Sequence, residues 1–218
     1  MTKKPRICES ESGIQDPATA GMYDRIARQL RDWGWNGVRE MLSAGLGSGA
    51  LLEVEPGPGY LGLELARQLG SRSLTGCGDS PAMLPIARKN AAEYGLPADY
   101  VLGSAMDLPF PDGSFDCVVS NGCLHEWETP RRVFDEIWRV LRPGGRFCVT
   151  DLRRDAAPWK QWLLWLLVRY RPLRTGLQSS MAAAYTVPEL EAILRQTRLA
   201  DAQVRRTFLG LCVCGAKS

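Results

Sequence analysis

Short apolar runs alternate with amphipathic stretches along most of the chain. The clearest pair begins at residues 51–54 (Leu-Leu-Glu-Val), and a turn that carries Gly57 and Gly59 follows directly. Leu61 and Leu65 then repeat with the spacing of one helical face. A strand, a glycine turn and a helix in this order leave backbone N–H groups bare at the strand's carboxyl end, where a nucleotide-bearing ligand can bind.

The same alternation continues to about residue 150. We expect further strands at residues 74–78, 100–102, 115–120 and 146–150. Helices are expected at residues 18–30, 80–94, 129–141 and 186–194, with start signals at Ser80-Pro81, Thr129-Pro130 and Thr186-Val187-Pro188-Glu189. Strands separated by helices of this length predict an α/β protein whose parallel sheet is covered on both faces.

The last third of the chain has a different pattern. Pro143-Gly144-Gly145 is expected to end the helix before the strand at 146–150. Residues 202–209 and 211–214 are predicted to be two antiparallel strands that a tight turn at Gly210 joins. We expect residues 1–17 to form a flexible arm and residues 18–218 a single domain, with a cap segment at about 152–185.

Composition narrows the class of protein further. The net charge of +3 does not indicate a nucleic-acid-binding protein. The longest apolar run, residues 162–168, is far shorter than the ~20 residues that a membrane span needs. Met1–Gln15 is polar and does not resemble a signal peptide. Seven cysteines without a Cys-x-x-Cys pair, together with one histidine, favour a reduced cytoplasmic protein without a metal site.

Five motifs follow one another along the chain. They are Leu-Glu-Val-Glu-Pro-Gly-Pro-Gly at 52–59, Gly-Asp-Ser-Pro-Ala-Met-Leu at 78–84, Asp-Leu-Pro-Phe-Pro-Asp-Gly-Ser-Phe-Asp at 107–116, Leu-His-Glu-Trp at 124–127 and Val-Leu-Arg-Pro-Gly-Gly-Arg-Phe at 140–147. In this order they resemble the class I S-adenosylmethionine-dependent methyltransferases, in particular the ubiquinone and menaquinone group. The resemblance covers about residue 23 to the C-terminus.

The resemblance implies a Rossmann-like, doubly wound sheet of seven mostly parallel strands, with an antiparallel last strand and helices on both faces. It also implies S-adenosylmethionine as the methyl donor and a small-molecule acceptor. The donor-binding residues that it implies are Tyr23, Glu53, Glu55, Gly57, Gly59, Asp79, Ser80, Met83, Ser104, Ala105, Met106 and Asn121.

Three positions depart from the family pattern at this donor site. Glu55 replaces the first glycine of the turn, Gly78 replaces the acid that binds the ribose, and Ser104 replaces an acid that receives the adenine amino group. One interpretation is tolerated drift, in which Asp79 rotates into the ribose site. A second is compensation, in which Glu55 reaches the ribose through space vacated at Gly78. In the third, the remodelled pocket binds another ligand, or regulates, without methylating.

Two segments bear on the acceptor. His125 is the only histidine and follows the fourth strand, where it is a candidate general base or a structural residue beside the donor. Residues 159–174 combine three tryptophans with leucines and basic residues. This pattern predicts an apolar cap over an apolar acceptor; its outer surface either contacts a membrane peripherally or packs against the domain or a second subunit.

Overall fold

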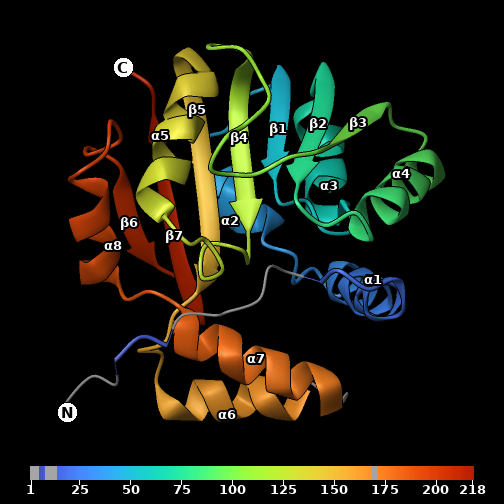
Figure 1. Ribbon diagram of the computed structural model, residues 1–218, viewed down its shortest axis with the longest axis vertical. Coiled ribbons are helices and arrows are strands. Elements are labelled where there is room, and N and C mark those ends of the chain that lie inside the picture. Colours follow the sequence, from blue (N-terminus) through green and yellow to red (C-terminus); the bar gives the residue numbers. More distant parts are fainter. Residues whose placement is uncertain (1–4, 8–13, 168–170) are drawn as a thin grey trace.

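The computed structural model describes residues 5–7, 14–167 and 171–218. In this part of the chain, seven strands form one sheet in the order β3-β2-β1-β4-β5-β7-β6 (Figure 1). The strands are β1 (Ala50–Val54), β2 (Ser73–Gly78), β3 (Ala98–Leu102), β4 (Phe115–Asn121), β5 (Leu141–Leu152), β6 (Gln203–Arg206) and β7 (Gly210–Ala216). The helices are α1 (Pro17–Asp32), α2 (Val38–Ser43), α3 (Tyr60–Leu69), α4 (Met83–Tyr94), α5 (Pro130–Val140), α6 (Pro158–Leu167), α7 (Arg171–Ala183) and α8 (Val187–Leu194).

Strand direction agrees with the predicted sheet. β1 pairs in parallel with both β2 and β4, and β2 pairs in parallel with β3. β7 lies between β5 and β6 and is antiparallel to both. The prediction of a mostly parallel, seven-stranded sheet with an antiparallel last strand is therefore confirmed.

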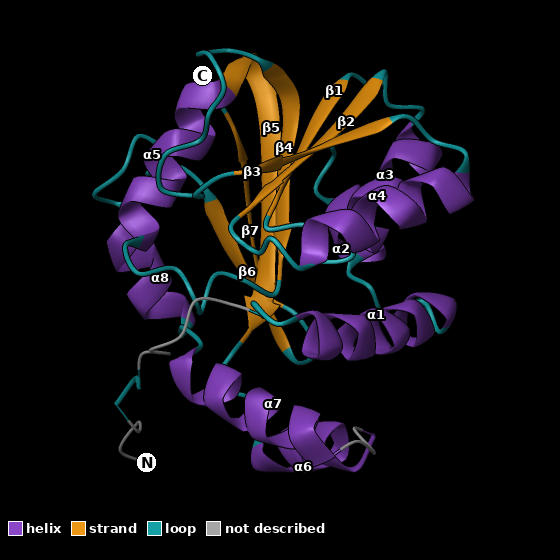
Figure 2. Cartoon of the chain, turned by 45° about the vertical axis from the view of Figure 1, so that its right-hand side comes forward, coloured by secondary structure: helices purple, strands orange, loops and turns teal. Residues whose placement is uncertain are grey.

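The two faces of the sheet carry separate hydrophobic cores because neighbouring strand residues point to opposite sides. Leu51 packs in the core beneath α2, α3 and α4, whereas Leu52 packs in the core beneath α5 and α8. Both leucines are buried. Figure 2 shows the same arrangement from the side, with helices on both faces of the sheet.

The carboxyl ends of the parallel strands meet at one edge of the sheet. In Figure 1 this edge faces α1 and the pair α6–α7, which lie below it. Arg6 of the predicted flexible arm donates Nε–H to the Ala183 carbonyl at the end of α7 (2.5 Å). Residues 1–4 and 8–13 of that arm lie outside the described residues.

Three predicted boundaries were wrong. α4 begins at Met83, and Ser80 lies before its first turn and accepts a hydrogen bond from the Met83 N–H. β5 begins at Leu141 rather than at residue 146. Pro143-Gly144-Gly145 does not end the helix before the strand but lies within β5, where the pairing with β4 shifts in register. Gly210 is the first residue of β7 rather than the turn itself.

Three helices were not predicted individually. α2 has only six residues, and its apolar positions are too few to reveal a period. α6 and α7 occupy the predicted cap segment, where continuous apolar and basic residues hide the helical repeat.

Candidate donor and acceptor site

The predicted site residues lie on four neighbouring strand ends. Glu55, Gly57 and Gly59 follow β1, Asp79 and Ser80 follow β2, Ser104, Ala105 and Met106 follow β3, and Asn121 and His125 end or follow β4. Because these strands are parallel neighbours, all four loops open at the carboxyl edge that faces α1 and α6–α7 (Figure 1). An edge of this kind is where open α/β sheets bind ligands.

The two glycines of the first turn have different surroundings. Gly57 has a positive φ of 52°, and a Cβ there would meet only the Tyr23 ring of α1, at 3.9 Å. Gly59 has a φ of 84°, and its Cβ would lie 2.5 Å from the Tyr100 hydroxyl of β3. Gly57 thus leaves room for a ligand, whereas Gly59 permits internal packing between the turn and β3.

Glu53 points into the protein rather than toward the loops. It is 2% exposed, and its Oε2 accepts the Gly62 N–H in the first turn of α3 (3.1 Å). A Cβ at Gly62 would overlap this oxygen. Burial raises the pKa of Glu53 to about 8, and the hydrogen bond only partly opposes this shift. Glu53 therefore supports the start of α3, and with it the position of the glycine turn.

Glu55 is the one non-glycine residue of the described part with a positive φ, 54°. Its Oε2 accepts the Asp79 N–H at 3.3 Å. A Cβ at Gly78 would lie 2.9 Å from the same oxygen. Burial, with the charge of Asp79 as a smaller cause, raises the pKa of Glu55 to about 8. The Glu55 carboxylate therefore occupies the space at the end of β2 that a side chain at position 78 would need.

The loops after β2 and β3 are shaped largely by backbone contacts. The Ser80 hydroxyl donates to the Ile14 carbonyl (2.5 Å), and the exposed Ser104 hydroxyl accepts the Met106 N–H (3.2 Å). Met83 and Ala105 are buried, at 4% and 5% exposure. These residues can therefore form the wall of a ligand site, and Ser104 offers a polar group on its open side.

His125 is buried and held by Asp151, which sequence reasoning did not identify as a site residue. The Asp151 carboxylate lies 2.9 and 3.0 Å from His125 Nδ1 and accepts the His125 backbone N–H at 2.7 Å. A carboxylate only accepts, so Nδ1 carries the proton and Nε2 is the basic nitrogen. Nε2 lies 3.7 Å from Glu126 Oε1. This pairing gives His125 a fixed orientation and a defined tautomer.

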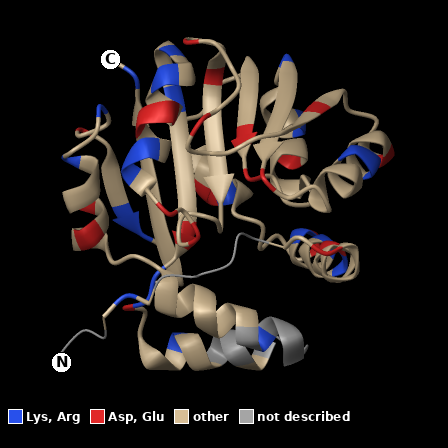
Figure 3. Cartoon of the chain, in the orientation of Figure 1, with Lys and Arg blue, Asp and Glu red and all other residues tan. Residues whose placement is uncertain are grey.

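The surroundings of His125 are acidic. The Cys123 Sγ lies 3.6 Å from the Glu55 carbonyl. Burial raises the pKa of the Cys123 thiol, and the charges of Glu126 and Glu55 raise it further. Figure 3 shows acidic residues at the lower ends of the central strands. Opposite charges attract, so this edge favours a positively charged ligand such as a sulfonium.

Asn121 points away from this acidic group. Its Oδ1 accepts the Thr150 hydroxyl (2.7 Å), and a Cβ at Gly37 would lie 3.0 Å from it. The structure thus places the Asn121 side chain toward the loop before α2. Its backbone remains at the carboxyl edge of β4.

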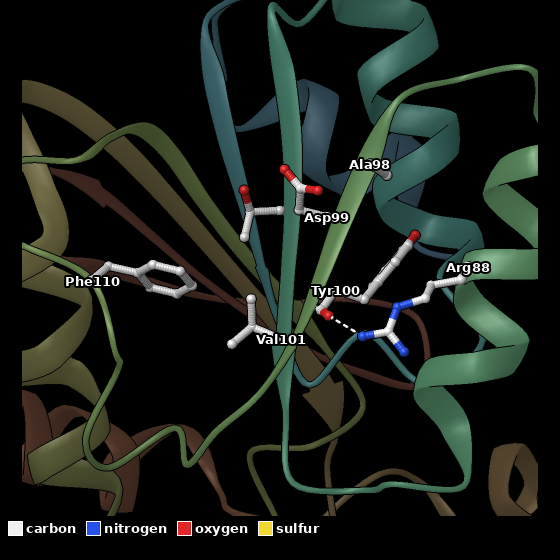
Figure 4. Close-up of a pocket in the computed structure, with 7 residues that line it drawn as sticks. Arg88, Ala98, Asp99, Tyr100, Val101 and Phe110 are labelled. Atoms are coloured by element: carbon white, nitrogen blue, oxygen red, sulfur yellow. Dashed lines mark hydrogen bonds between the residues drawn. The ribbon is translucent and has the colours of Figure 1, made fainter.

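A hollow lies elsewhere on the molecule. Its volume is about 540 Å³, and it follows the outer strand β3 (Figure 4). Arg88 donates to the Tyr100 carbonyl there (2.5 Å). The residues that line it are Thr75, Arg88, Ala98, Asp99, Tyr100, Val101 and Phe110, and none of them belongs to the predicted site. The residues predicted to bind the donor therefore lie at the carboxyl edge and not in this hollow.

Comparisons with known proteins bear on the same region. The "Methyltransferase domain" family matches residues 52–149. The demethylmenaquinone methyltransferase of Deinococcus radiodurans is 28% identical and covers 90% of this chain and 86% of its own length. The enzyme of that name from Thermus thermophilus is 32% identical, and the match spans 61% of each chain. This chain therefore spans about three fifths of the Thermus relative.

A solved structure extends the similarity to the fold. The S-adenosylmethionine-dependent methyltransferase of Aquifex aeolicus superposes with a TM-score of 0.69 at 19% identity, over 94% of this chain and all of that one. The open Gly57 face leaves room for a ligand, and the family match and the similar fold imply S-adenosylmethionine as the methyl donor. In fold, motif order and sequence, the chain is therefore similar to the class I S-adenosylmethionine-dependent methyltransferases.

Proposed function

We propose that this protein transfers the methyl group of S-adenosylmethionine to a small apolar acceptor that it takes from an anionic lipid surface. The observation that supports this acceptor class is the outer face of α6, formed by Trp159, Trp162 and Leu166. These side chains follow the i, i+3, i+7 spacing of one helical face, and they are 58%, 61% and 43% exposed. Exposed tryptophans on a helix are typical of membrane-surface contact.

The turn between β6 and β7 extends this apolar face. Phe208 is 56% exposed, and its ring meets that of Trp159 edge-on at 5.9 Å. Lys160 Nζ lies 4.3 Å from the Phe208 ring centre and donates to the Phe208 carbonyl. Residues 156–188 contain four basic residues and no acidic one, and Figure 3 shows no red on α6 or α7. Such a surface is attracted to anionic lipid headgroups.

The position of α6–α7 connects this surface to the chemistry. The helix pair lies below the carboxyl edge, so its inner side faces that edge while its outer side faces away (Figure 1). Two of the relatives are named for methylating demethylmenaquinone. Acceptors of that class are therefore the first to assay with this protein.

The reaction needs a proton acceptor and alignment. S-Adenosylmethionine supplies a methyl group on a positively charged sulfur, which makes the methyl carbon electrophilic. His125 takes the proton of the acceptor's hydroxyl or acidic carbon at Nε2, and Asp151 stabilises the resulting imidazolium. The acceptor atom then forms its bond to the methyl carbon, and the carbon–sulfur bond breaks with its electrons left on sulfur. The fixed loops of four strands hold the reacting atoms in line.

We infer the compartment from the free cysteine thiols rather than from the lengths of the helices. Cys77, Cys117, Cys123, Cys148, Cys212 and Cys214 are all free in the described structure. Free thiols support a reducing compartment, and we infer that the proposed reaction takes place at the cytoplasmic surface of a membrane. No helix among the described residues has the length and apolar character of a membrane span.

The test uses purified protein, methyl-labelled S-adenosylmethionine and a reduced demethylmenaquinone in mixed vesicles. We expect labelled product, and we expect His125→Gln to lower kcat by about 10²–10⁴, the usual contribution of a general base. Binding of S-adenosylhomocysteine without transfer to any acceptor would instead support the alternative. In that alternative, the pocket remodelled at Glu55, Gly78 and Ser104 binds another ligand or regulates without methylating.

A further inference from the structure

The Glu55 side chain is held in a costly conformation at the edge of the donor site. A positive φ is unfavourable for a residue with a Cβ, by roughly 1–2 kcal/mol. The Glu55 N–H donates to the Cys77 carbonyl of β2 (2.8 Å), which fixes the backbone. The carboxylate then turns toward the end of β2, over Gly78. Strain of this kind at the edge of a binding site points to a role for the side chain.

The Glu55 carboxylate retains an unused oxygen. Oε2 accepts the Asp79 N–H, and no donor among the described residues reaches Oε1. The side chain is half-buried, so ligand hydroxyls reach it in a site with little competing water. Hydrogen bonds donated by ligand hydroxyls favour the charged form of a carboxyl group, so on binding Glu55 can act as a carboxylate and accept from a vicinal diol.

The order of the strands decides which part of the donor the Glu55 carboxylate faces. Along the edge the order is β3, β2, β1, β4. The reacting methyl must lie near His125, which follows β4, and the Ser104–Met106 loop after β3 is at the other end. A donor laid across the edge therefore has its sulfur near β1 and β4, its base near β3, and its ribose over the end of β2.

We propose that Glu55, reaching from the β1 turn over Gly78, binds the ribose hydroxyls of the donor in place of a carboxylate from β2 itself. Gly78 leaves the space for this, because a Cβ there would lie 2.9 Å from the Glu55 carboxylate oxygen and Glu55 would have to move. This proposal rests on the proposed function, since it takes S-adenosylmethionine as the donor. In this proposal Glu55, and not Asp79, binds the ribose. The Asp79 side chain is exposed, and among the described contacts Asp79 only donates its backbone N–H to Glu55.

The experiment measures calorimetric affinities for S-adenosylhomocysteine and its 2′-deoxy analogue. We expect the natural protein to prefer the ribose ligand by at least tenfold, and Glu55→Gln to reduce that preference to less than threefold. The Gln side chain fits the same space, so folding is preserved. Asp79→Asn should leave the preference within threefold of the natural protein. Asp201→Asn, which removes an exposed carboxylate before β6, is the matched control for charge alone.

A double-mutant cycle supplies an independent measurement. Glu55→Gly and Gly78→Asp should each weaken S-adenosylhomocysteine binding by tenfold or more, and the double variant should recover to within about threefold of the natural protein. Strictly additive losses would overturn the proposal. So would loss of the ribose preference in Asp79→Asn alone.

The outcomes also separate this proposal from the proposed function. Ribose-dependent binding without methyl transfer would refute the apolar acceptor and leave the role of Glu55 in place. Methyl transfer with a ribose preference that Glu55→Gln does not change would refute only the role of Glu55. Failure of the natural protein to bind S-adenosylhomocysteine at millimolar concentration would refute both.

Discussion

Glu53 and Glu55 are two residues apart, and burial raises the pKa of both carboxyl groups to about 8. Their roles differ because their partners differ. Glu53 accepts a backbone N–H of α3 inside the protein, whereas Glu55 lies at the open edge beside Asp79. Each holds its proton in the folded state at a pH where the unfolded chain, with a pKa near 4.5, has lost it.

Stability should therefore fall as the pH rises from about 5 to about 8. In this window the folded state binds more protons than the unfolded state, so each group lowers the free energy of unfolding by up to ~1.4 kcal/mol per pH unit. Glu53→Gln removes the contribution of the more buried group and keeps an acceptor for Gly62. We expect the variant to gain roughly 1–4 kcal/mol relative to the natural protein between pH 5.5 and 8.5.

Urea unfolding at several pH values measures this difference. Glu191→Gln, which removes an exposed carboxylate on α8, is the matched control and should give a difference that does not change with pH. A constant difference for Glu53→Gln would mean that Glu53 is ionised in the folded protein.

Some residue-scale contacts could be predicted from the sequence and others could not. The reach of Glu55 into the space at Gly78 was one of three interpretations that the sequence left open, and it depends on the adjacent ends of β1 and β2. The role of Glu55 at the ribose stays a prediction. Asp151 was missed because it comes 26 residues after His125 and no spacing rule links the two. Only the adjacency of β4 and β5 brings them into contact.

At the scale of elements, the glycines separate two physical effects. Gly59 combines a φ of 84° with a Cβ position that overlaps Tyr100, whereas Gly70 has a φ of 62° and open space around it. Gly21 lies within α1 with neither constraint. Replacement by alanine therefore measures backbone strain together with steric overlap at Gly59 and backbone strain alone at Gly70. At Gly21 it measures helix propensity alone.

We expect Gly59→Ala to lower the free energy of unfolding by roughly 2–4 kcal/mol, because strain adds to overpacking. Gly70→Ala should cost about 1 kcal/mol from strain. Gly21→Ala should stabilise the protein by about 0.5–1 kcal/mol, since alanine favours a helix interior. Urea unfolding of the three variants tests this ranking, and equal losses at Gly59 and Gly70 would show that Tyr100 moves aside without cost.

Most element boundaries followed from capping and breaking residues, and the failures have local causes. The capping box at Thr186 and the Thr129-Pro130 start were placed correctly. Pro143-Gly144-Gly145 was read as a break before the strand, yet Gly144 N–H donates to the Lys217 carbonyl and so continues the ladder with the C-terminal residues. A turn-forming sequence is therefore overridden where a neighbouring strand supplies hydrogen-bond partners.

At the scale of the whole molecule, the sheet separates two tasks. The loops after β1, β2 and β3 form the proposed donor side, whereas His125 follows β4 and contacts Asp151 near the end of β5. The alternation of strands and helices predicted the parallel part of the sheet, and the resemblance implied its seven strands, although α2, α6 and α7 carried no readable period. The sequence left open whether the cap's tryptophans are buried, since an apolar aromatic run is compatible with either outcome. Trp159 and Trp162 are exposed in the structure, and the side chain of Trp165 lies outside the described residues.

This arrangement predicts that lipid binding and acceptor methylation depend on the same tryptophans. The protein should sediment with anionic vesicles, less so as salt rises, because headgroup attraction is screened. Its tryptophan fluorescence should shift to the blue on binding. Trp159→Ser with Trp162→Ser should weaken vesicle binding about 10–100-fold, if the two side chains together contribute ~1.4–2.8 kcal/mol at the interface. The KM for an acceptor presented in those vesicles should rise by a similar factor, while kcat changes less than twofold.

A short-chain, water-soluble acceptor distinguishes membrane contact from a structural role of the tryptophans. With that acceptor the double variant should retain its kcat/KM within about twofold, because only delivery from the lipid surface has been lost. Trp33→Ser with Trp35→Ser is the matched control, since both tryptophans are 54% exposed in the loop before α2. Equal effects of the two pairs would show that α6 has no special part in binding lipid. Loss of activity toward the soluble acceptor would show instead that Trp159 and Trp162 stabilise the cap, and the acceptor would then reach His125 without a membrane.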